Sequence, residues 1–156
     1  MSKIDFKDQC GLNSLISEEF CDWSQALTIS QEMIDTFAEL TGDKLWIHTD
    51  PARCAEQSPF KSTIAHGFLI LSLLSKMPMG EDITQKISGY SQIMNYGSDK
   101  LRFLQPVPVD SEIHARSRVM SVAVNEHKTV VTLENQIQMV HTDKPSLLYQ
   151  LSLVLM

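Results

Sequence analysis

The feature that most constrains the fold is a two-residue alternation of apolar and polar side chains in the second half of the sequence. Between residues 112 and 124, EIHARSRVMSVAV places Ile113 and Ala115 on one face and charged side chains on the other. Segments 128–140 and 146–156 are also strand-like, and only short polar connections separate the three. Such alternation is typical of strands with one buried face. We therefore predict an antiparallel meander joined by hairpin turns.

A strongly apolar segment, IAHGFLILSLLSKM at residues 64–77, precedes these strands, and Pro78 ends it. Its side chains are apolar almost all round, so a helix formed here must be enclosed on most sides. The economical packing is an α+β fold in which the antiparallel sheet curls around this helix. That arrangement is the hotdog fold, and the length suits a single domain over residues 1–156.

Four further elements are expected outside these segments. Residues 1–20 suggest a short helical lead-in, residues 23–29 alternate as a strand does, and residues 101–103 form a further strand. Ser30 is a plausible N-cap for a helix with apolar side chains at helical spacing. We expect this helix to end at Gly42, because glycine readily adopts the conformation that terminates helices.

Charge and cysteine content exclude several classes of function. With 13 basic and 19 acidic residues the net charge is −6, which disfavours general binding to nucleic acid or anionic membranes. Cys10, Cys21 and Cys54 have no metal-site spacing and are odd in number, as expected in a reducing compartment. The N-terminal residues do not resemble a signal peptide, and no window approaches the roughly 20 apolar residues of a membrane helix. We expect a cytoplasmic protein.

The stretch TGDKLWIHTD, residues 41–50, places an acid and an imidazole close together. Asp43 and His48 are five residues apart, whereas side chains stack on one helix face at spacings of three or four. The two side chains can therefore converge only if the chain turns between them, which Gly42 permits. The alternative is that Asp43 caps a turn and His48 lies on the surface.

Two long segments resemble a known family. FAELTGDKLWIHTDPARCAEQSPFKSTIAHGFLILSLL, residues 37–74, closely resembles the hydratase-2 motif of the MaoC-like dehydratases, the (R)-specific enoyl-CoA hydratases. MNYGSDKLRFLQPVPVDSEIHARSRV, residues 94–119, resembles their nodulation-protein-N-like branch. The resemblance spans roughly residues 23–154. Leu45 and Trp46 depart from it, because many of these hydratases have Asn-Pro there; Leu45 removes a polar side chain that could brace the loop or meet a ligand.

The resemblance implies reversible hydration of a trans-2-enoyl thioester to an (R)-3-hydroxyacyl thioester, with no cofactor. Asp43 and His48 would share one water molecule, and the sequence leaves open which of them is acid and which is base. Gly67, at the start of the apolar helix, would offer its backbone N–H to the thioester oxygen as an oxyanion hole. Alternatively, Gly67 only allows close packing of the helix against the sheet.

We predict roles for four further residues near this motif. Ser75 either supports the acid–base pair or bonds its own backbone. Asn95 and Tyr96, in the N-Y-G segment, are expected to line the acyl pocket or brace its wall. His66 is expected to be structural, because a lone histidine at a helix start is more often a satisfied structural residue.

Two other functions stay open. A hotdog thioesterase would use a carboxylate to activate water, although the central helix contains no Asp or Glu. A non-catalytic module that binds acyl thioesters is the second possibility. No metal is expected, because His48, Asp50 and His66 match no strong zinc pattern. The expected partners are an acyl-CoA substrate and a second copy of the chain in a homodimer or larger assembly.

Overall fold

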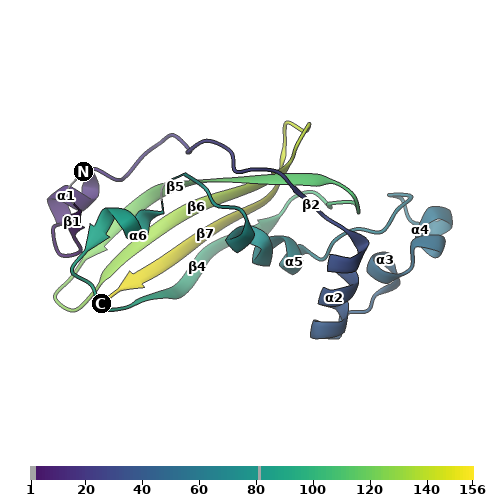
Figure 1. The fold of residues 1–156 in the computed structure, drawn as a ribbon, viewed down its shortest axis with the longest axis horizontal. Coiled ribbons are helices and arrows are strands. Elements are labelled where there is room, and N and C mark those ends of the chain that lie inside the picture. The colour runs from purple at the N-terminus through teal and green to yellow at the C-terminus, as the bar shows by residue number, and fades with distance from the viewer. Residues whose placement is uncertain (1–2, 81) are drawn as a thin grey trace.

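A five-stranded antiparallel sheet is the largest feature of the structure, a computed structural model that describes residues 3–80 and 82–156. Its strands are β2 (Leu27–Thr28), β4 (Ile93–Phe103), β5 (Glu112–Val124), β6 (Thr129–Met139) and β7 (Pro145–Leu155). They lie in the order β2-β5-β6-β7-β4. Figure 1 shows the four long strands side by side.

The predicted meander is confirmed. β5 has the expected bounds, β6 is one residue shorter than expected at each end, and β7 begins and ends one residue earlier. Asn125 shapes the first hairpin turn, since its side-chain oxygen accepts from the backbone N–H groups of His127 and Lys128 at 3.0 and 2.9 Å. Ile113 and Ala115 are fully buried on the inward face, as their alternation predicted.

The strand expected at residues 101–103 is the end of a much longer strand. β4 pairs with β7 over eleven residues and contains two register irregularities in its first half. Most of its side chains are exposed, because β4 lies at the outer edge of the sheet. An exposed edge strand needs no apolar alternation, which is why the sequence pattern indicated only its last residues.

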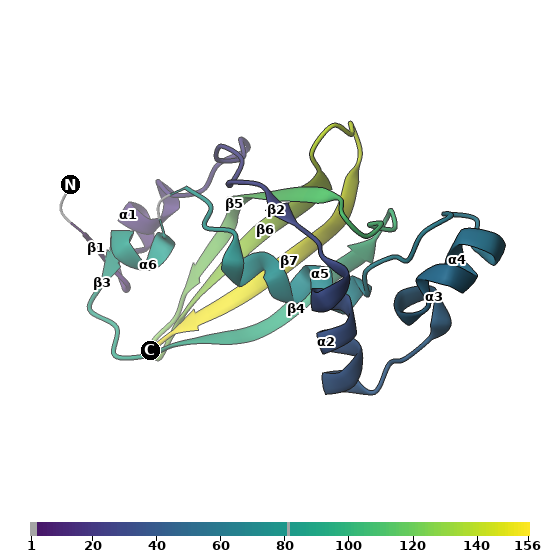
Figure 2. The same ribbon diagram turned by 45° about the vertical axis from the view of Figure 1, so that its right-hand side comes forward.

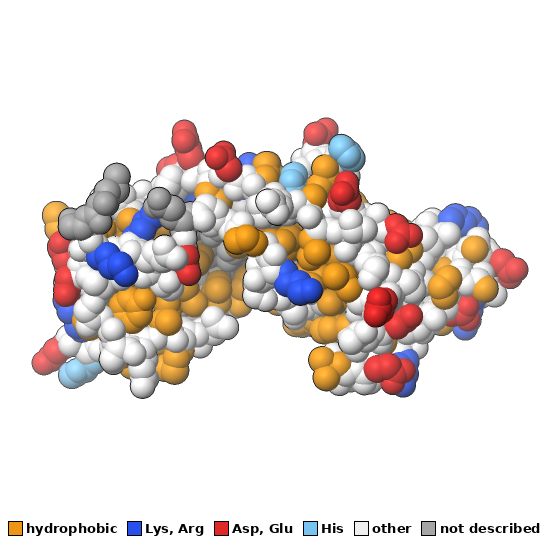
Figure 3. Space-filling view, viewed as in Figure 1, with side chains coloured by type: hydrophobic (Ala, Val, Ile, Leu, Met, Phe, Trp, Pro, Cys, Tyr) orange, Lys and Arg blue, Asp and Glu red, His pale blue; other side chains and the backbone are white. Residues whose placement is uncertain are grey.

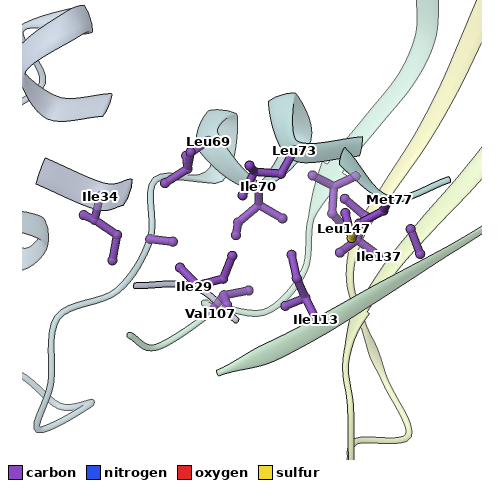
Figure 4. Packing of buried hydrophobic residues seen from close by; sticks show 12 residues of the cluster. Ile29, Ile34, Leu69, Ile70, Leu73, Met77, Val107, Ile113, Ile137 and Leu147 are labelled. Carbon is purple, nitrogen blue, oxygen red and sulfur yellow. The ribbon is translucent and has the colours of Figure 1, made fainter. Parts of the chain in front are cut away.

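The apolar helix lies against the sheet, which confirms the α+β hotdog fold. It comprises α5 (Gly67–Ser72) and a continuing 3₁₀ turn, η1 (Leu73–Lys76), and is shorter than the predicted span of residues 64–77. Figure 4 shows its buried side chains pointing toward those of the strands. Each fully buried side chain of this size contributes about 1.5–3 kcal/mol to stability. The labelled members of this core are Ile29, Ile34, Leu69, Ile70, Leu73, Met77, Val107, Ile113, Ile137 and Leu147.

One side of this helix is open, so the expectation that it is enclosed on most sides was wrong for a single chain. Phe68 is 60% exposed, and Ser72, Ser75 and Lys76 are exposed on the same helical segment. In Figure 3 hydrophobic side chains reach the surface in the region of α5 and η1. The described part of the chain provides no element that covers them.

Three helices project from one end of the sheet, as Figure 2 shows. They are α2 (Gln31–Thr41), α3 (Trp46–Thr49) and α4 (Pro51–Gln57). The predicted bounds of α2 are confirmed. The Ser30 hydroxyl accepts from the Met33 N–H at 3.2 Å, and Gly42 ends the helix in the left-handed conformation.

The N-terminal residues cover the other end of the sheet, together with a segment that follows the central helix (Figure 1). Here lie β1 (Ile4–Asp5), α1 (Gln9–Asn13), α6 (Ile83–Lys86) and β3 (Ile87–Ser88). The helical lead-in predicted at residues 1–20 is therefore confirmed only for α1, and residues 1 and 2 lie outside the described residues.

The strand predicted at residues 23–29 is regular only at β2. The irregular chain before it still pairs with β5, because the backbone N–H groups of Ser17, Cys21 and Ser24 donate to β5 carbonyls at 2.8–3.1 Å. This edge of the sheet is therefore covered. In the described ranges, no helix is long and apolar enough to cross a membrane.

Candidate active site

Gly42 and a short helix bring Asp43 and His48 together. Gly42 leaves α2 with a φ of 80°, a left-handed conformation that favours glycine. The chain then enters α3, of which His48 is the third residue. The turn that the five-residue spacing required is present. Leu45 occupies the N-cap position of α3 and provides no side-chain hydrogen bond there, so its departure from the family pattern leaves this helix uncapped.

Backbone contacts fix the orientation of the His48 ring. Its Nδ1 lies 2.7 Å from the carbonyl oxygen of Ile64. Because a carbonyl only accepts, Nδ1 carries the proton, and the Nε2 of the neutral ring has a free lone pair. The Gln31 side chain donates to the His48 carbonyl at 2.8 Å and so ties α3 to the start of α2. His48 can therefore accept a proton at Nε2 without first reorienting.

His66 lies directly against this pair, and its position there is the main feature that sequence reasoning missed. Its side chain is 4% exposed, and its ring stacks on His48 with centroids 3.8 Å apart and planes 26° apart. His66 Nε2 lies 2.9 Å from the backbone carbonyl of Asp43. The sequence gives little sign of this contact, because Asp43 and His66 are 23 positions apart.

Asp43, His48 and His66 form one cluster. Each offers a ligand atom, and these atoms lie within 4.8 Å of one another. One water molecule that makes two hydrogen bonds of about 2.8 Å can span such a gap. Two of the nitrogens in the cluster are already used, because His66 Nε2 lies against the Asp43 carbonyl and His48 Nδ1 against the Ile64 carbonyl. The cluster has room for one bridging water molecule, and the absence of a metal stays a prediction.

Gly67 opens a cavity of about 240 Å³ beside His48. Gly67 is the first residue of α5, and none of the residues 3–80 and 82–156 accepts a hydrogen bond from its N–H. A Cβ at this position would lie 2.7 Å from the Phe103 ring, so only glycine fits without displacing that ring. The other lining residues are mainly apolar and include Ile64, Ala65, Ile70, Leu104, Pro106, Val107 and Leu147.

The other predicted site residues lie elsewhere. Ser75 is exposed, its hydroxyl donates to the Ser72 carbonyl at 3.1 Å, and it borders a second cavity of about 520 Å³. Asn95 and Tyr96 are exposed on β4, and the Tyr96 hydroxyl accepts from Lys128 at 3.0 Å. A single chain thus brings together Asp43, His48 and Gly67 but none of these three, whose predicted roles stay predictions.

Cys54 packs against the backbone of α3. It is fully buried in α4, and its thiol lies 3.6 Å from the carbonyl oxygens of Trp46 and Ile47. Burial raises the pKa of the Cys54 thiol, and the negative charge of Asp50 raises it further, against a lowering by Arg53. The thiol therefore stays protonated and acts as a small packing group and weak donor.

Comparison with known proteins agrees with this geometry. The family model described as "MaoC like domain" matches residues 16–141. The 3-hydroxyacyl-thioester dehydratase Z of Mycobacterium tuberculosis is 39% identical over 126 residues, covering 80% of this chain and 79% of that protein. Nodulation protein N of Rhizobium meliloti is 37% identical over 143 residues, covering 87% of this chain and 85% of that protein.

A solved structure extends the likeness to three dimensions. The (R)-hydratase from A. caviae involved in PHA biosynthesis is 27% identical and superposes with a TM-score of 0.65, covering 88% of this chain and 96% of that one. The matched residues 16–141 include the cluster, Gly67 and the whole of β4 to β6. The chain therefore belongs to the MaoC-like domain family.

Proposed function

We propose that this protein is a hydro-lyase that reversibly adds water to a trans-2-enoyl thioester and forms an (R)-3-hydroxyacyl thioester. The observation that carries the proposal is the convergence of Asp43 and a His48 nitrogen within 4.8 Å, beside a cavity that His48 and Gly67 both line. Relatives named dehydratase and (R)-hydratase support the same reaction class.

The acid and the imidazole suit a single attacking water. Both the Asp43 carboxylate and His48 Nε2 can accept from the two protons of that water. As the water oxygen bonds to the β-carbon, one water O–H bond breaks and one of the pair takes that proton. The same proton is then passed to the α-carbon, which bonds it with the electron pair of the double bond, so both side chains end as they began. The sum is one water added across the double bond. Because both groups lie on one side of the substrate, addition to one face follows.

The thioester oxygen gains negative charge while the carbon–carbon double bond is attacked. The free Gly67 N–H is placed to stabilise this charge, and it lies at the helix start, where further N–H groups are unpaired. The cavity wall is mainly apolar, and a hydrogen bond is stronger in such low-dielectric surroundings than in water. Gly67 therefore acts as a donor and also permits the close contact with Phe103.

The test is hydration of crotonyl-CoA, followed as loss of the enoyl thioester absorbance, with an acyl-chain series and chiral analysis of the product. Asp43→Asn and His48→Ala should each lower kcat by about 10²–10⁴-fold. Asp50→Asn is the matched control. Asp50 caps α4 by accepting from the Arg53 N–H at 2.9 Å, and asparagine caps equally well, so this variant should keep the wild-type rate.

The same assay separates the alternatives. Release of free thiol without loss of the double bond would identify a thioesterase. Saturable binding of acyl thioesters with no turnover across the series would identify a binding module. Normal rates in both Asp43→Asn and His48→Ala would show that the assigned pair is wrong.

We also propose that the functional unit contains a second copy of the chain, paired along β4. The β5 edge is covered by residues 17–28, whereas the β4 edge has no neighbour in the described chain. Large apolar side chains are exposed along or beside it, and unpaired strand edges readily pair with another strand. They are Phe68, Met94, Tyr96, Phe103 and Leu104, each 46–60% exposed.

This pairing would return Asn95 and Tyr96 to the site. In an antiparallel two-fold pairing over the whole strand, Ile93 of one copy lies opposite Phe103 of the other. Asn95 and Tyr96 would then lie near the end of the neighbouring β4, where Phe103 borders the cavity. The N-Y-G segment would thus complete the wall of the other copy's site.

Subunit mixing tests this arrangement. Light scattering should give at least a dimeric mass, and a monomer at assay concentration would contradict the proposal. Asn95→Ala should impair hydration by removing a wall residue. Subunits of Asp43→Asn and Asn95→Ala, mixed and exchanged, should then regain about a quarter of wild-type activity, because half of the dimers carry one intact site of two. No recovery despite exchange would place Asn95 in the site of its own chain or outside both.

A further inference from the structure

We propose that His66 is a positioning residue that holds Asp43 and His48 in register, and this inference rests on the function proposed above. His66 is buried and touches both reactive residues, one through a hydrogen bond and the other through ring stacking. It touches no reacting atom in this scheme, so its effect on the reaction passes through the other two.

The hydrogen bond anchors the segment that carries the acid. His66 Nε2 donates to the Asp43 carbonyl at 2.9 Å, whereas the other bond to this residue, from the Asp43 N–H to the Thr41 hydroxyl, is 3.4 Å long and weak. The Asp43 carboxylate itself has no hydrogen-bond or ionic partner in the part of the chain that the structure describes. The position of the carboxylate therefore depends on a backbone that His66 holds.

The stacking holds the imidazole. His48 lies against one face of the His66 ring at 3.8 Å, and the Phe37 ring contacts His66 at 5.1 Å with planes tilted by 52°. His48 is already held by Nδ1 at the Ile64 carbonyl, a bond about which the ring could still swing. The face of His66 restricts that swing, so the same side chain sets the distance between Asp43 and His48 Nε2.

The chemistry of the side chain points to this role rather than to packing alone. His66 occupies the N-cap of α5 but makes no side-chain capping bond. Its Nδ1 is buried without a partner among the described residues, which is unfavourable. A phenylalanine would avoid that cost and would still stack, but it could not donate to the Asp43 carbonyl. A glutamine could donate but could not stack.

Two variants separate the two contacts, and one serves as a matched control. His66→Phe keeps the stacking face and His66→Gln keeps a donor. His114→Phe is the control, because His114 also stacks on a ring at 3.8 Å, that of Trp23, and also buries a nitrogen without a described partner, but lies on β5 outside the site. If His66 were only structural, His66→Phe and His114→Phe would behave alike.

We expect kcat for hydration to fall about 10²-fold in His66→Phe, the size of effect that a misplacement near 1 Å produces, with KM within about threefold. His66→Gln should retain more activity than His66→Phe, and His114→Phe should match wild type. If both His66 variants fold and keep kcat within threefold of wild type, the positioning role is refuted. Equal losses in kcat for His66→Phe and His114→Phe would refute it as well.

An NMR measurement keeps this inference separate from the proposed function. Ring ¹⁵N shifts should show the Nε2–H tautomer for His66 and the Nδ1–H tautomer for His48. His66→Phe, or His66→Gln if the former does not fold, should shift the amide signals of residues 42–45, which His114→Phe should leave in place. Inactivity of the wild type with these results would refute only the hydration proposal. A His66 ring protonated at Nδ1 alone, or unmoved signals at residues 42–45, would refute the positioning role whatever the activity.

Discussion

Substituting alanine for Gly67 tests the oxyanion hole most directly, because it leaves the backbone N–H in place. The added Cβ would lie 2.7 and 2.8 Å from two carbons of the Phe103 ring. The ring must therefore retreat by about 0.7 Å to reach ordinary van der Waals contact near 3.4 Å. Gly67 has no left-handed φ, so alanine adds no backbone strain.

Two consequences of different size follow from this geometry. Phe103 is 47% exposed and can move outward, so the loss of stability should be near the lower end for overpacking, about 1 kcal/mol, or a fall in Tm of about 2–4 °C. The methyl group, however, stands where the thioester oxygen must approach the N–H. Loss of one such donor lowers kcat by about 10²–10³-fold. Activity should therefore fall far more than stability.

The assay combines crotonyl-CoA hydration with thermal unfolding of Gly67→Ala, Phe103→Ala and the double variant. Removing the Phe103 ring relieves the contact, so the double variant should regain stability relative to Gly67→Ala. If Gly67 is the donor, kcat/KM of the double variant stays low compared with Phe103→Ala alone. Recovery of both quantities would show that Gly67 serves close packing only, and wild-type kcat/KM in Gly67→Ala would refute the oxyanion assignment outright.

Three further predictions concern residues around the site and the sheet. Burial, and next the positive charge of Arg116, lower the pKa of His114 from its ordinary value of about 6.5. As the pH falls, His114 is therefore protonated in the unfolded chain before it is protonated in the folded protein. The stability that a neutral His114 contributes is therefore present above about pH 6.5 and lost as the pH falls below that value. Denaturant titrations should show that the free energy of unfolding falls less below pH 6.5 in His114→Phe than in wild type. Leu45→Asn should raise the free energy of unfolding by about 0.5–2 kcal/mol by supplying the missing cap of α3, and an unchanged denaturation midpoint would contradict this. Cys54 is fully buried with a raised pKa, so iodoacetamide should modify the exposed Cys10 in the native protein and Cys54 only after unfolding, as peptide mass spectrometry can check.

The elements that the sequence predicted well carry their signals locally. The bounds of α2 follow from the Ser30 hydroxyl at one end and Gly42 at the other, both within a turn of the helix they delimit. The strands β5 and β6 follow from the alternation of apolar and polar side chains, whereas β7 was predicted from its strand-like composition and does not alternate regularly in burial. The same local signals placed Asp43 after a turn and Gly67 at a helix start, which are the observed positions.

The features that the sequence did not predict depend on distant partners. The first part of β4 has no alternation to detect, since an edge strand with two register irregularities buries neither face regularly. His66 looked structural because nothing near it in sequence explains its side chain. Its partners, the Asp43 carbonyl and the His48 ring, are brought to it only by the packing of α2 and α3 beside α5.

The segment IAHG at positions 64–67 connects these observations, because three of its four residues contribute different parts of the site. Ile64 supplies the carbonyl that fixes the His48 tautomer, His66 supplies the contact with Asp43, and Gly67 supplies a free N–H. The backbone of this stretch is itself held, with the Ile64 N–H donating to the Ile47 carbonyl at 3.1 Å and the Ala65 N–H to the Val107 carbonyl at 2.8 Å. A shift of this segment would move the three residues of the proposed site, Asp43, His48 and Gly67, together. Their relative geometry is therefore set by one segment of main chain, which accounts for how a pair carried by an exposed loop and a four-residue helix can be held in the arrangement that the proposed reaction needs.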